Sequence, residues 1–124
     1  MSRVVPPTIG RAPSPERLDL LVVGAGPCGL AAAIAAQREG LSVRILDAGA
    51  VVSTITQYPY YVSFFSTAEK LALGGIPFGG AAYKPSRRDG LAYDRAIVRH
   101  FALDVHQYER VTEVERAADG VRVD

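Results

Sequence analysis

The clearest pattern of hydrophobic positions lies in the first half of the chain. Residues 20–23 (LLVV) form a short apolar run that ends at a glycine, which is typical of a parallel strand covered on both faces. Residues 29–39 are rich in Ala and contain no interior Gly or Pro, so they predict a helix that Gly40 ends. Residues 42–46 predict a second strand, followed directly by Asp47. This order of strand, glycine turn, helix and strand predicts a βαβ unit.

A long connection is predicted for residues 48–85. Seven of the ten aromatic residues fall between Tyr58 and Tyr83, together with two glycine pairs. Long irregular connections usually line a ligand site or pack over the domain. The aromatic side chains are therefore expected either to bracket a planar ligand ring or to pack in the core and lid, at positions Tyr58, Tyr60, Tyr61, Phe64 and Phe65.

Residues 86–103 predict a second long helix. Ser86 and Asp89 have the spacing of a capping box at its start. An apolar residue recurs every fourth position on one face, at Tyr93, Ile97 and Phe101. The tail predicts three short strands, over residues 104–108, 111–116 and 121–123, with a turn at Asp119-Gly120 before the last of them.

Together these elements predict an α/β fold. It is a Rossmann-like βαβ domain with a central parallel sheet, incomplete as it stands, plus a C-terminal β-hairpin. Residues 1–17 hold four of the eight prolines and lack the apolar run of a signal peptide, so they are expected to form a flexible arm. The domain is expected to occupy residues 18–124.

Composition excludes several classes of protein. The 124 residues allow one ordinary domain, and a net charge of +1 argues against a basic nucleic-acid-binding surface. The longest uncharged apolar stretch is interrupted by Gly and Pro, which argues against a membrane span of about 20 residues. Cys28 is the single cysteine, so an internal disulfide is excluded, and the two histidines lie too far apart to predict a metal site. We therefore expect a soluble, cytoplasmic protein.

The strongest chemical motif is the glycine-rich turn. Gly24, Gly26 and Gly29 have the G-x-G-x-x-G spacing of a dinucleotide-binding loop, between a predicted strand and a predicted helix. Gly24 permits the tight turn, Gly26 has no Cβ to block a pyrophosphate, and Gly29 lets the helix pack closely on the sheet. Asp47, at the end of the second strand, can accept hydrogen bonds from ribose hydroxyls and disfavours a 2′-phosphate.

Several strings carry a resemblance to a known family. The string GAGPCGLAAA, with Pro27 in the turn, resembles flavoproteins with two dinucleotide domains and FAD as cofactor. Residues 64–71 (FFSTAEKL), with 49–55, 58–59, 76–78 and 84–85, resemble the bacillithiol-disulfide reductase family. These are thioredoxin-reductase-like flavoproteins that use NADPH and FAD. The resemblance covers residues 18–124; Asp47, Ala48 and Tyr60-Tyr61 depart from the usual Glu, Lys and Thr-His.

The resemblance implies a function and a set of site residues. The chain would be the N-terminal, FAD-binding part of a longer reductase, inactive alone, that passes electrons from NADPH through FAD to a low-molecular-weight thiol disulfide such as bacillithiol disulfide. NADPH would bind to a domain outside this chain, and a homo-oligomer is one option for the full-length protein. The implied FAD contacts are Gly24, Gly26, Pro27, Cys28, Gly29, Asp47, Ala48 and Val111.

Cys28 is the implied catalytic residue. It falls in the first helical turn, where the helix dipole stabilises a thiolate. The resemblance implies that this thiol meets the disulfide substrate. The alternative is that the position only requires a small side chain.

Two further functions remain open. A flavin monooxygenase shares the glycine loop, but it usually carries a Gly-Gly-x-Trp element, and this chain contains no tryptophan. A catalytically silent nucleotide-binding remnant is the alternative outside the enzymes.

Overall fold

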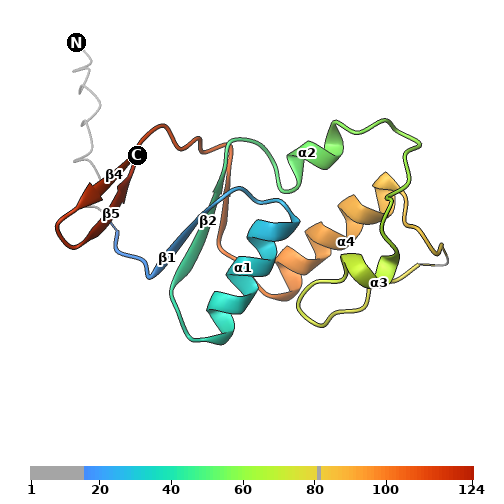
Figure 1. The fold of residues 1–124 in the computed structure, drawn as a ribbon, viewed down its shortest axis with the longest axis horizontal. Coiled ribbons are helices and arrows are strands. Elements are labelled where there is room, and N and C mark those ends of the chain that lie inside the picture. Colours follow the sequence, from blue (N-terminus) through green and yellow to red (C-terminus); the bar gives the residue numbers. More distant parts are fainter. Residues whose placement is uncertain (1–15, 81) are drawn as a thin grey trace, which may run out of the picture.

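The centre of the computed structural model, which describes residues 16–80 and 82–124, is a parallel three-stranded sheet (Figure 1). Strand β2 (Val43–Asp47) lies between β1 (Leu20–Val23) and β3 (Val105–Gln107). In the register of the sheet, Ile45 pairs with both Val22 and Val105. Because the strands are parallel, the loops that follow all three leave from the same edge, and this edge carries the candidate site.

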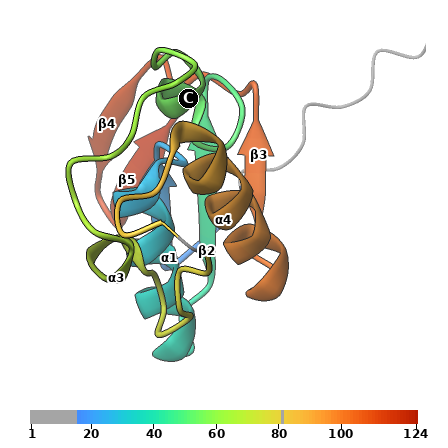
Figure 2. The same cartoon turned by 90° about the vertical axis from the view of Figure 1, so that its right-hand side faces the viewer.

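Two long helices cover one face of the sheet. Helix α1 (Pro27–Arg38) and helix α4 (Arg87–His100) lie on the same side of the strands in Figures 1 and 2. The buried core between these layers includes Leu30, Ala33 and Ile34 of α1, Ile45 of β2, and Leu91 and Ile97 of α4. The α/β fold with a parallel sheet and a hairpin is confirmed.

The C-terminal hairpin lies on the opposite side of the sheet from the long helices (Figures 1 and 2). It consists of β4 (Val114–Ala117) and β5 (Gly120–Val123), with Ala117 paired with Gly120. The predicted turn at Asp119-Gly120 is wrong by one residue, because this register makes Ala118 and Asp119 the two turn residues. Gly120 has a φ of +153° and already belongs to the strand. The strand predicted from residue 111 begins only at Val114.

Most of the features predicted for the two long helices are confirmed. Ser86 accepts a hydrogen bond from the Asp89 N–H, and Asp89 accepts one from the Ser86 N–H, which completes the capping box. The three residues of the predicted apolar face, Tyr93, Ile97 and Phe101, all belong to the core or pack against it. Helix α1 begins at Pro27, two residues earlier than predicted, because a proline at the first helical position loses no helical hydrogen bond.

The connection over residues 48–85 contains two short helices that the sequence pattern did not predict. These are α2 (Ser53–Thr56) and α3 (Ala68–Leu71). Arg87, at the start of α4, fixes the end of α2 by donating to the carbonyl oxygens of Ile55 and Thr56, at 3.2 and 2.8 Å. The connection is therefore docked on α4.

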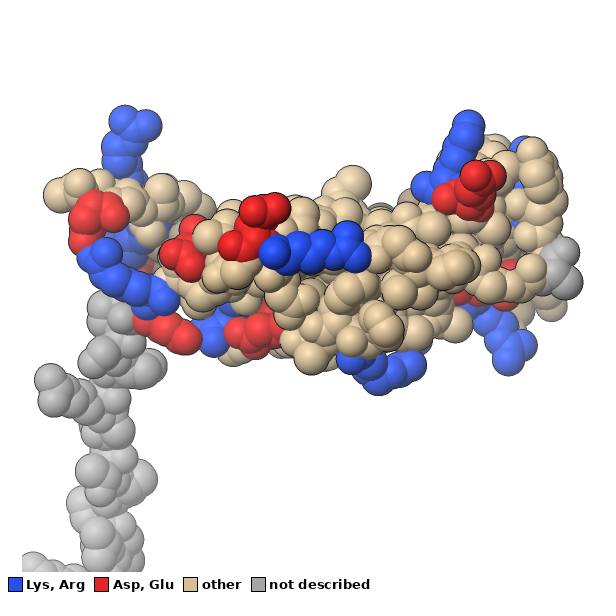
Figure 3. Space-filling model, turned by 90° about the horizontal axis from the view of Figure 1, so that it is seen from below, with Lys and Arg blue, Asp and Glu red and all other residues tan. Residues whose placement is uncertain are grey.

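Most of the proposed N-terminal arm, residues 1–15, lies outside the described residues. Glu16 forms an ion pair with Arg44 of β2, and Arg17 pairs with Asp119 of the hairpin turn. These two residues therefore contact the domain. On the face shown in Figure 3, acidic and basic side chains are interspersed. None of the helices in the described part of the chain has the length and apolar character needed to cross a membrane.

Candidate nucleotide-binding site

The glycine-rich loop connects the end of β1 to the start of α1. Gly24 has a φ of +109°, a backbone conformation that strongly favours glycine, and its N–H donates to the Leu46 carbonyl at 2.8 Å. Gly26 is the N-cap of α1 and has an extended backbone. A Cβ atom on Gly26 would meet nothing within 4 Å. The space in front of this turn is therefore open to a ligand.

Gly29 has a different role in the same loop. A Cβ atom at this position would lie 2.0 Å from the carbonyl oxygen of Gly24 and 3.2 Å from the Val22 side chain. The helix therefore approaches the strand more closely than any side chain at residue 29 allows. This is the close packing that the sequence motif predicts for its third glycine.

The N-terminus of α1 is free to receive an anion. In the described structure no side chain caps it, and its first turn holds no acidic residue. Pro27 occupies the first helical position, and Cys28 and Gly29 follow it. The unpaired N–H groups of such a turn and the helix dipole both favour a phosphate group.

Asp47 links the glycine loop to the loop after β2. Its Oδ2 accepts a hydrogen bond from the Ala25 N–H at 2.7 Å, and its Oδ1 accepts one from the Gly49 N–H at 2.7 Å. A carboxylate has about four lone-pair positions, so each oxygen keeps one for a further donor. Asp47 can therefore position the loop and still accept the hydroxyl groups of a ribose.

A groove of about 240 Å³ lies at this edge of the sheet. Eight residues line it: Val23, Gly24, Leu46, Asp47, Ala48, Glu109, Arg110 and Val111. Four of the eight predicted contacts, Gly24, Asp47, Ala48 and Val111, thus surround one cavity. The other four belong to the start of α1 and do not line the groove.

Two residues of the groove, Glu109 and Arg110, were not predicted from the sequence. They follow β3, which pairs with β2 so that Gln107 lies beside Asp47. The Glu109 N–H donates to the Asp47 carbonyl at 2.9 Å, and the Tyr108 N–H donates to the Gly49 carbonyl at 3.0 Å. The available signal was that a third parallel strand ends at the same edge, where ligands of open α/β sheets bind.

Cys28 lies in the first turn of α1 and is exposed as a free thiol. It does not line the groove. An exposed thiol at a helix start is accessible to a small disulfide.

The aromatic cluster divides between the two expected roles. Phe64 packs against the core, and its ring contacts Tyr58 edge-on with centroids 6.3 Å apart. Tyr61 and Phe65 are 92% and 95% exposed, and Tyr60 is also exposed. The exposed rings are therefore available to a ligand or to another part of the protein, whereas Phe64 is a packing residue.

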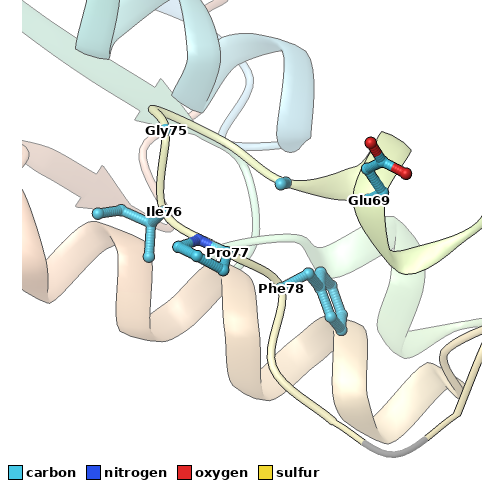
Figure 4. Close-up of a pocket in the computed structure, with 6 residues that line it drawn as sticks. Glu69, Gly75, Ile76, Pro77 and Phe78 are labelled. Atoms are coloured by element: carbon cyan, nitrogen blue, oxygen red, sulfur yellow. The ribbon is translucent and has the colours of Figure 1, made fainter.

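A second cavity, of about 420 Å³, lies beside α3 (Figure 4). It is lined by Glu69, Ala72, Gly75, Ile76, Pro77 and Phe78. The loop that forms it is attached to the C-terminal end of α1, where Arg38 donates to the Gly74 carbonyl at 2.5 Å. It therefore lies at the other end of α1 from the glycine loop.

Within the described ranges, no three side chains form a group that could hold a metal ion.

Comparison with known proteins places this chain in a family. The family model described as pyridine nucleotide-disulphide oxidoreductase matches residues 21–124. The bacilliredoxin reductase Bdr of Bacillus subtilis (strain 168) is 39% identical over 79 residues, which is 64% of this chain and 24% of the relative. The chain thus spans about a quarter of that protein.

Two solved structures show how closely the fold is shared. The bacillithiol disulfide reductase Bdr (YpdA) from Staphylococcus aureus is 38% identical, with a TM-score of 0.82 over 84% of this chain and 32% of that one. A flavin-containing monooxygenase from Stenotrophomonas maltophilia is 31% identical, with a TM-score of 0.80 over 86% of this chain and 33% of that one. Because the family model matches most of this chain, the chain belongs to the pyridine nucleotide-disulphide oxidoreductase family.

Proposed function

We propose that this chain binds the adenosine diphosphate part of FAD in a flavin-dependent oxidoreductase that reduces a low-molecular-weight thiol disulfide. The observation that carries the proposal is that one glycine loop adjoins both spaces: Gly24 lines the groove beside Asp47, and two residues further on Gly26 faces open space. A cofactor that contains both a ribose and a pyrophosphate requires such a pair of adjacent sites.

The residues of the site fit this cofactor one by one. Gly26 leaves room for the pyrophosphate, and the uncapped start of α1 supplies N–H donors to it. Asp47 accepts the ribose hydroxyls. Ala48 and Val111 line the wall of the groove, where the adenine would lie. In this assignment of contacts, the role of Gly24, Pro27 and Gly29 is to shape the loop rather than to make polar contacts with the cofactor.

Cys28 would perform the sulfur chemistry. Its thiolate attacks one sulfur of the substrate disulfide, which forms a mixed disulfide with Cys28 and releases one thiolate product. Bound FAD would supply the electron pair, taken from NADPH, that splits this mixed disulfide into the Cys28 thiolate and the second thiolate product. We assign NADPH binding to a part of the protein outside this chain. Bacillithiol disulfide is the proposed substrate, because two of the structural relatives are named as its reductases.

A monooxygenase is the second candidate function, because flavin monooxygenases are 31% identical and share the fold over 86% of the chain. Cys28 favours the reductase, since an exposed thiol has no role in transferring oxygen from a flavin.

The experiment measures the use of FAD and NADPH by the purified full-length protein, which includes the part assigned to NADPH binding. We expect a yellow protein that oxidises NADPH in proportion to added bacillithiol disulfide, with two thiols formed per NADPH. A rate of NADPH oxidation that does not depend on added disulfide, but matches the consumption of oxygen, would favour the monooxygenase. A protein that takes up no FAD would refute both assignments.

A further inference from the structure

Arg110 is the one basic residue among the eight described residues that line the nucleotide groove. Its side chain is exposed to solvent. In the described part of the chain, the arginines whose side chains form hydrogen bonds or ion pairs are Arg17, Arg38, Arg44, Arg87 and Arg122. Arg110 is not one of them, so all its N–H donors are available to a ligand.

The two carboxylates of the groove have other partners. Asp47 accepts hydrogen bonds from the N–H groups of Ala25 and Gly49, each at 2.7 Å. The Oε1 atom of Glu109 lies 3.2 Å from the ring Nδ1 of His106, which does not line the groove. Because neither carboxylate is paired with Arg110, the charge and the flat faces of its guanidinium are both free.

Arg110 lies at the wall of the groove opposite the glycine loop. In the sheet, β2 separates β1, which leads into Gly24, from β3, which leads into residues 109–111. The Glu109 N–H donates to the Asp47 carbonyl at 2.9 Å, and this bond fixes the segment 109–111 beside the loop after β2. The phosphates are assigned to Gly26 and the ribose to Asp47. Arg110 is therefore beside the space assigned to the adenine and not beside the space assigned to the phosphates.

The walls at this end of the groove suit a flat, uncharged ring. Ala48 and Val111 contribute small apolar side chains. A guanidinium is planar and more weakly hydrated than an ammonium group, so it stacks readily on the face of an aromatic ring. Adenine offers such a face and carries no charge of its own, so it can use Arg110 without an ion pair.

We propose that Arg110 is the specificity-determining residue for the adenine ring: its guanidinium stacks on the face of the ring that is turned away from Ala48 and Val111. The inference rests on the proposed nucleotide function of the groove. A stacking contact acts on the base and not on the phosphates. Arg110 should therefore contribute the same factor to the binding of FAD, ADP and adenosine, since all three contain adenine.

The test measures FAD affinity by flavin fluorescence on the full-length apoprotein, with ADP and adenosine as competitors. Competition with FAD restricts the measurement to the FAD site. Arg110→Ala should weaken the binding of ADP and of adenosine by the same factor, about three- to tenfold, the effect of one partly exposed contact between a cation and an aromatic ring. Arg110→Lys keeps the charge but loses the planar group, so it should recover only part of this loss.

Arg95→Ala is the matched control. Arg95 is an exposed arginine of α4 that does not line the groove, so its removal changes the charge of the protein by the same amount. This variant should bind both competitors as the unchanged protein does.

The outcomes separate this inference from the proposed function. If Arg110→Ala weakens ADP but not adenosine, or if Arg110→Lys binds both as tightly as the unchanged protein, Arg110 acts through its charge and the stacking role is refuted. Unchanged affinity of Arg110→Ala for both competitors would refute any contact with the adenine. If the unchanged protein binds neither FAD nor ADP, the nucleotide function itself is refuted. Far-UV circular dichroism checks the fold, and Arg110→Gln replaces Arg110→Ala in the same comparison should the alanine variant not fold.

Discussion

A Cβ atom on Gly29 would lie 2.0 Å from the carbonyl oxygen of Gly24, whereas one on Gly26 would meet nothing within 4 Å. The two glycines of one loop thus serve different purposes. Gly29 is required by contact within the protein, and Gly26 faces space that a ligand can enter. Substitution of each residue should therefore separate folding from binding.

Gly29→Ala should lower the free energy of unfolding by about 2–3 kcal/mol, because α1 must move away from the end of β1 to relieve the overlap. Chemical denaturation of the protein measures this loss. Gly26→Ala is the matched control, and its free energy of unfolding should stay within about 1 kcal/mol of the unchanged protein. Equal stability of the two alanine variants would contradict the packing role of Gly29.

Gly26→Val should leave the fold intact and weaken FAD binding by about tenfold or more, corresponding to a steric cost of at least about 1.4 kcal/mol. The valine side chain would enter the space assigned to the pyrophosphate. Titration of the apoprotein with FAD measures the affinity, and far-UV circular dichroism confirms the fold. Unchanged flavin affinity would show that the pyrophosphate does not pass Gly26.

The buried carboxyl of Asp94 makes stability depend on pH. Asp94 is 5% exposed on α4, and burial raises its pKa to about 6. In the unfolded chain an Asp has a pKa of about 3.9, so the native state binds this proton more tightly. Stability is therefore lost as the pH rises from about 4 to about 6 and stays lost above that range.

Asp94→Asn should raise the free energy of unfolding at pH 7 by up to about 3 kcal/mol, with no gain below about pH 4. Denaturation curves at several pH values measure this difference. Asp89→Asn is an informative control, because hydrogen bonds from the Ser86 backbone and hydroxyl lower the pKa of Asp89. This variant should instead destabilise the protein at pH 7. A stabilisation by Asp94→Asn that does not vary with pH would contradict the titration of Asp94.

Local patterns predicted the elements that hold the site but not all of its walls. The glycine loop and Asp47 were identifiable because each directly adjoins an apolar strand, and the turn chemistry of Gly24 and Gly29 follows from backbone geometry alone. Glu109 and Arg110 carry no such local signal. They reach the groove only because β3 pairs beside β2, a contact between segments about 60 residues apart in sequence.

The hairpin shows the same limit at a smaller scale. An Asp-Gly pair is a strong turn signal, yet cross-strand pairing of Val114 with Val123 and of Ala117 with Gly120 shifts the turn by one residue. Pairing between distant segments therefore determines the position of the hairpin turn and which residues form the wall of the groove. Local residue preferences did not predict either.

In the full-length protein, Cys28→Ala should separate disulfide reduction from flavin reduction. Alanine is a good helix former and matches cysteine closely in size, and the Cys28 side chain is exposed, so the fold and the bound FAD should be retained. NADPH should still be oxidised slowly by oxygen, since transfer of hydride to the flavin requires no sulfur. Reduction of bacillithiol disulfide should fall to the background rate, because the described part of the chain offers no other cysteine to form the mixed disulfide. Both rates are measured on one preparation, by NADPH absorbance and by thiol release.

Cys28→Ser provides the control for polarity, because a hydroxyl keeps the size and hydrogen-bonding capacity of the side chain but cannot attack the disulfide at neutral pH. It should behave as Cys28→Ala in both assays. If disulfide reduction continues in both variants at the unchanged rate, Cys28 serves only as a small residue at the start of α1. If both activities disappear together with the flavin, the side chain contributes to FAD binding rather than to sulfur chemistry. Only selective loss of disulfide reduction, with FAD and NADPH oxidation retained, assigns the reacting thiol to Cys28.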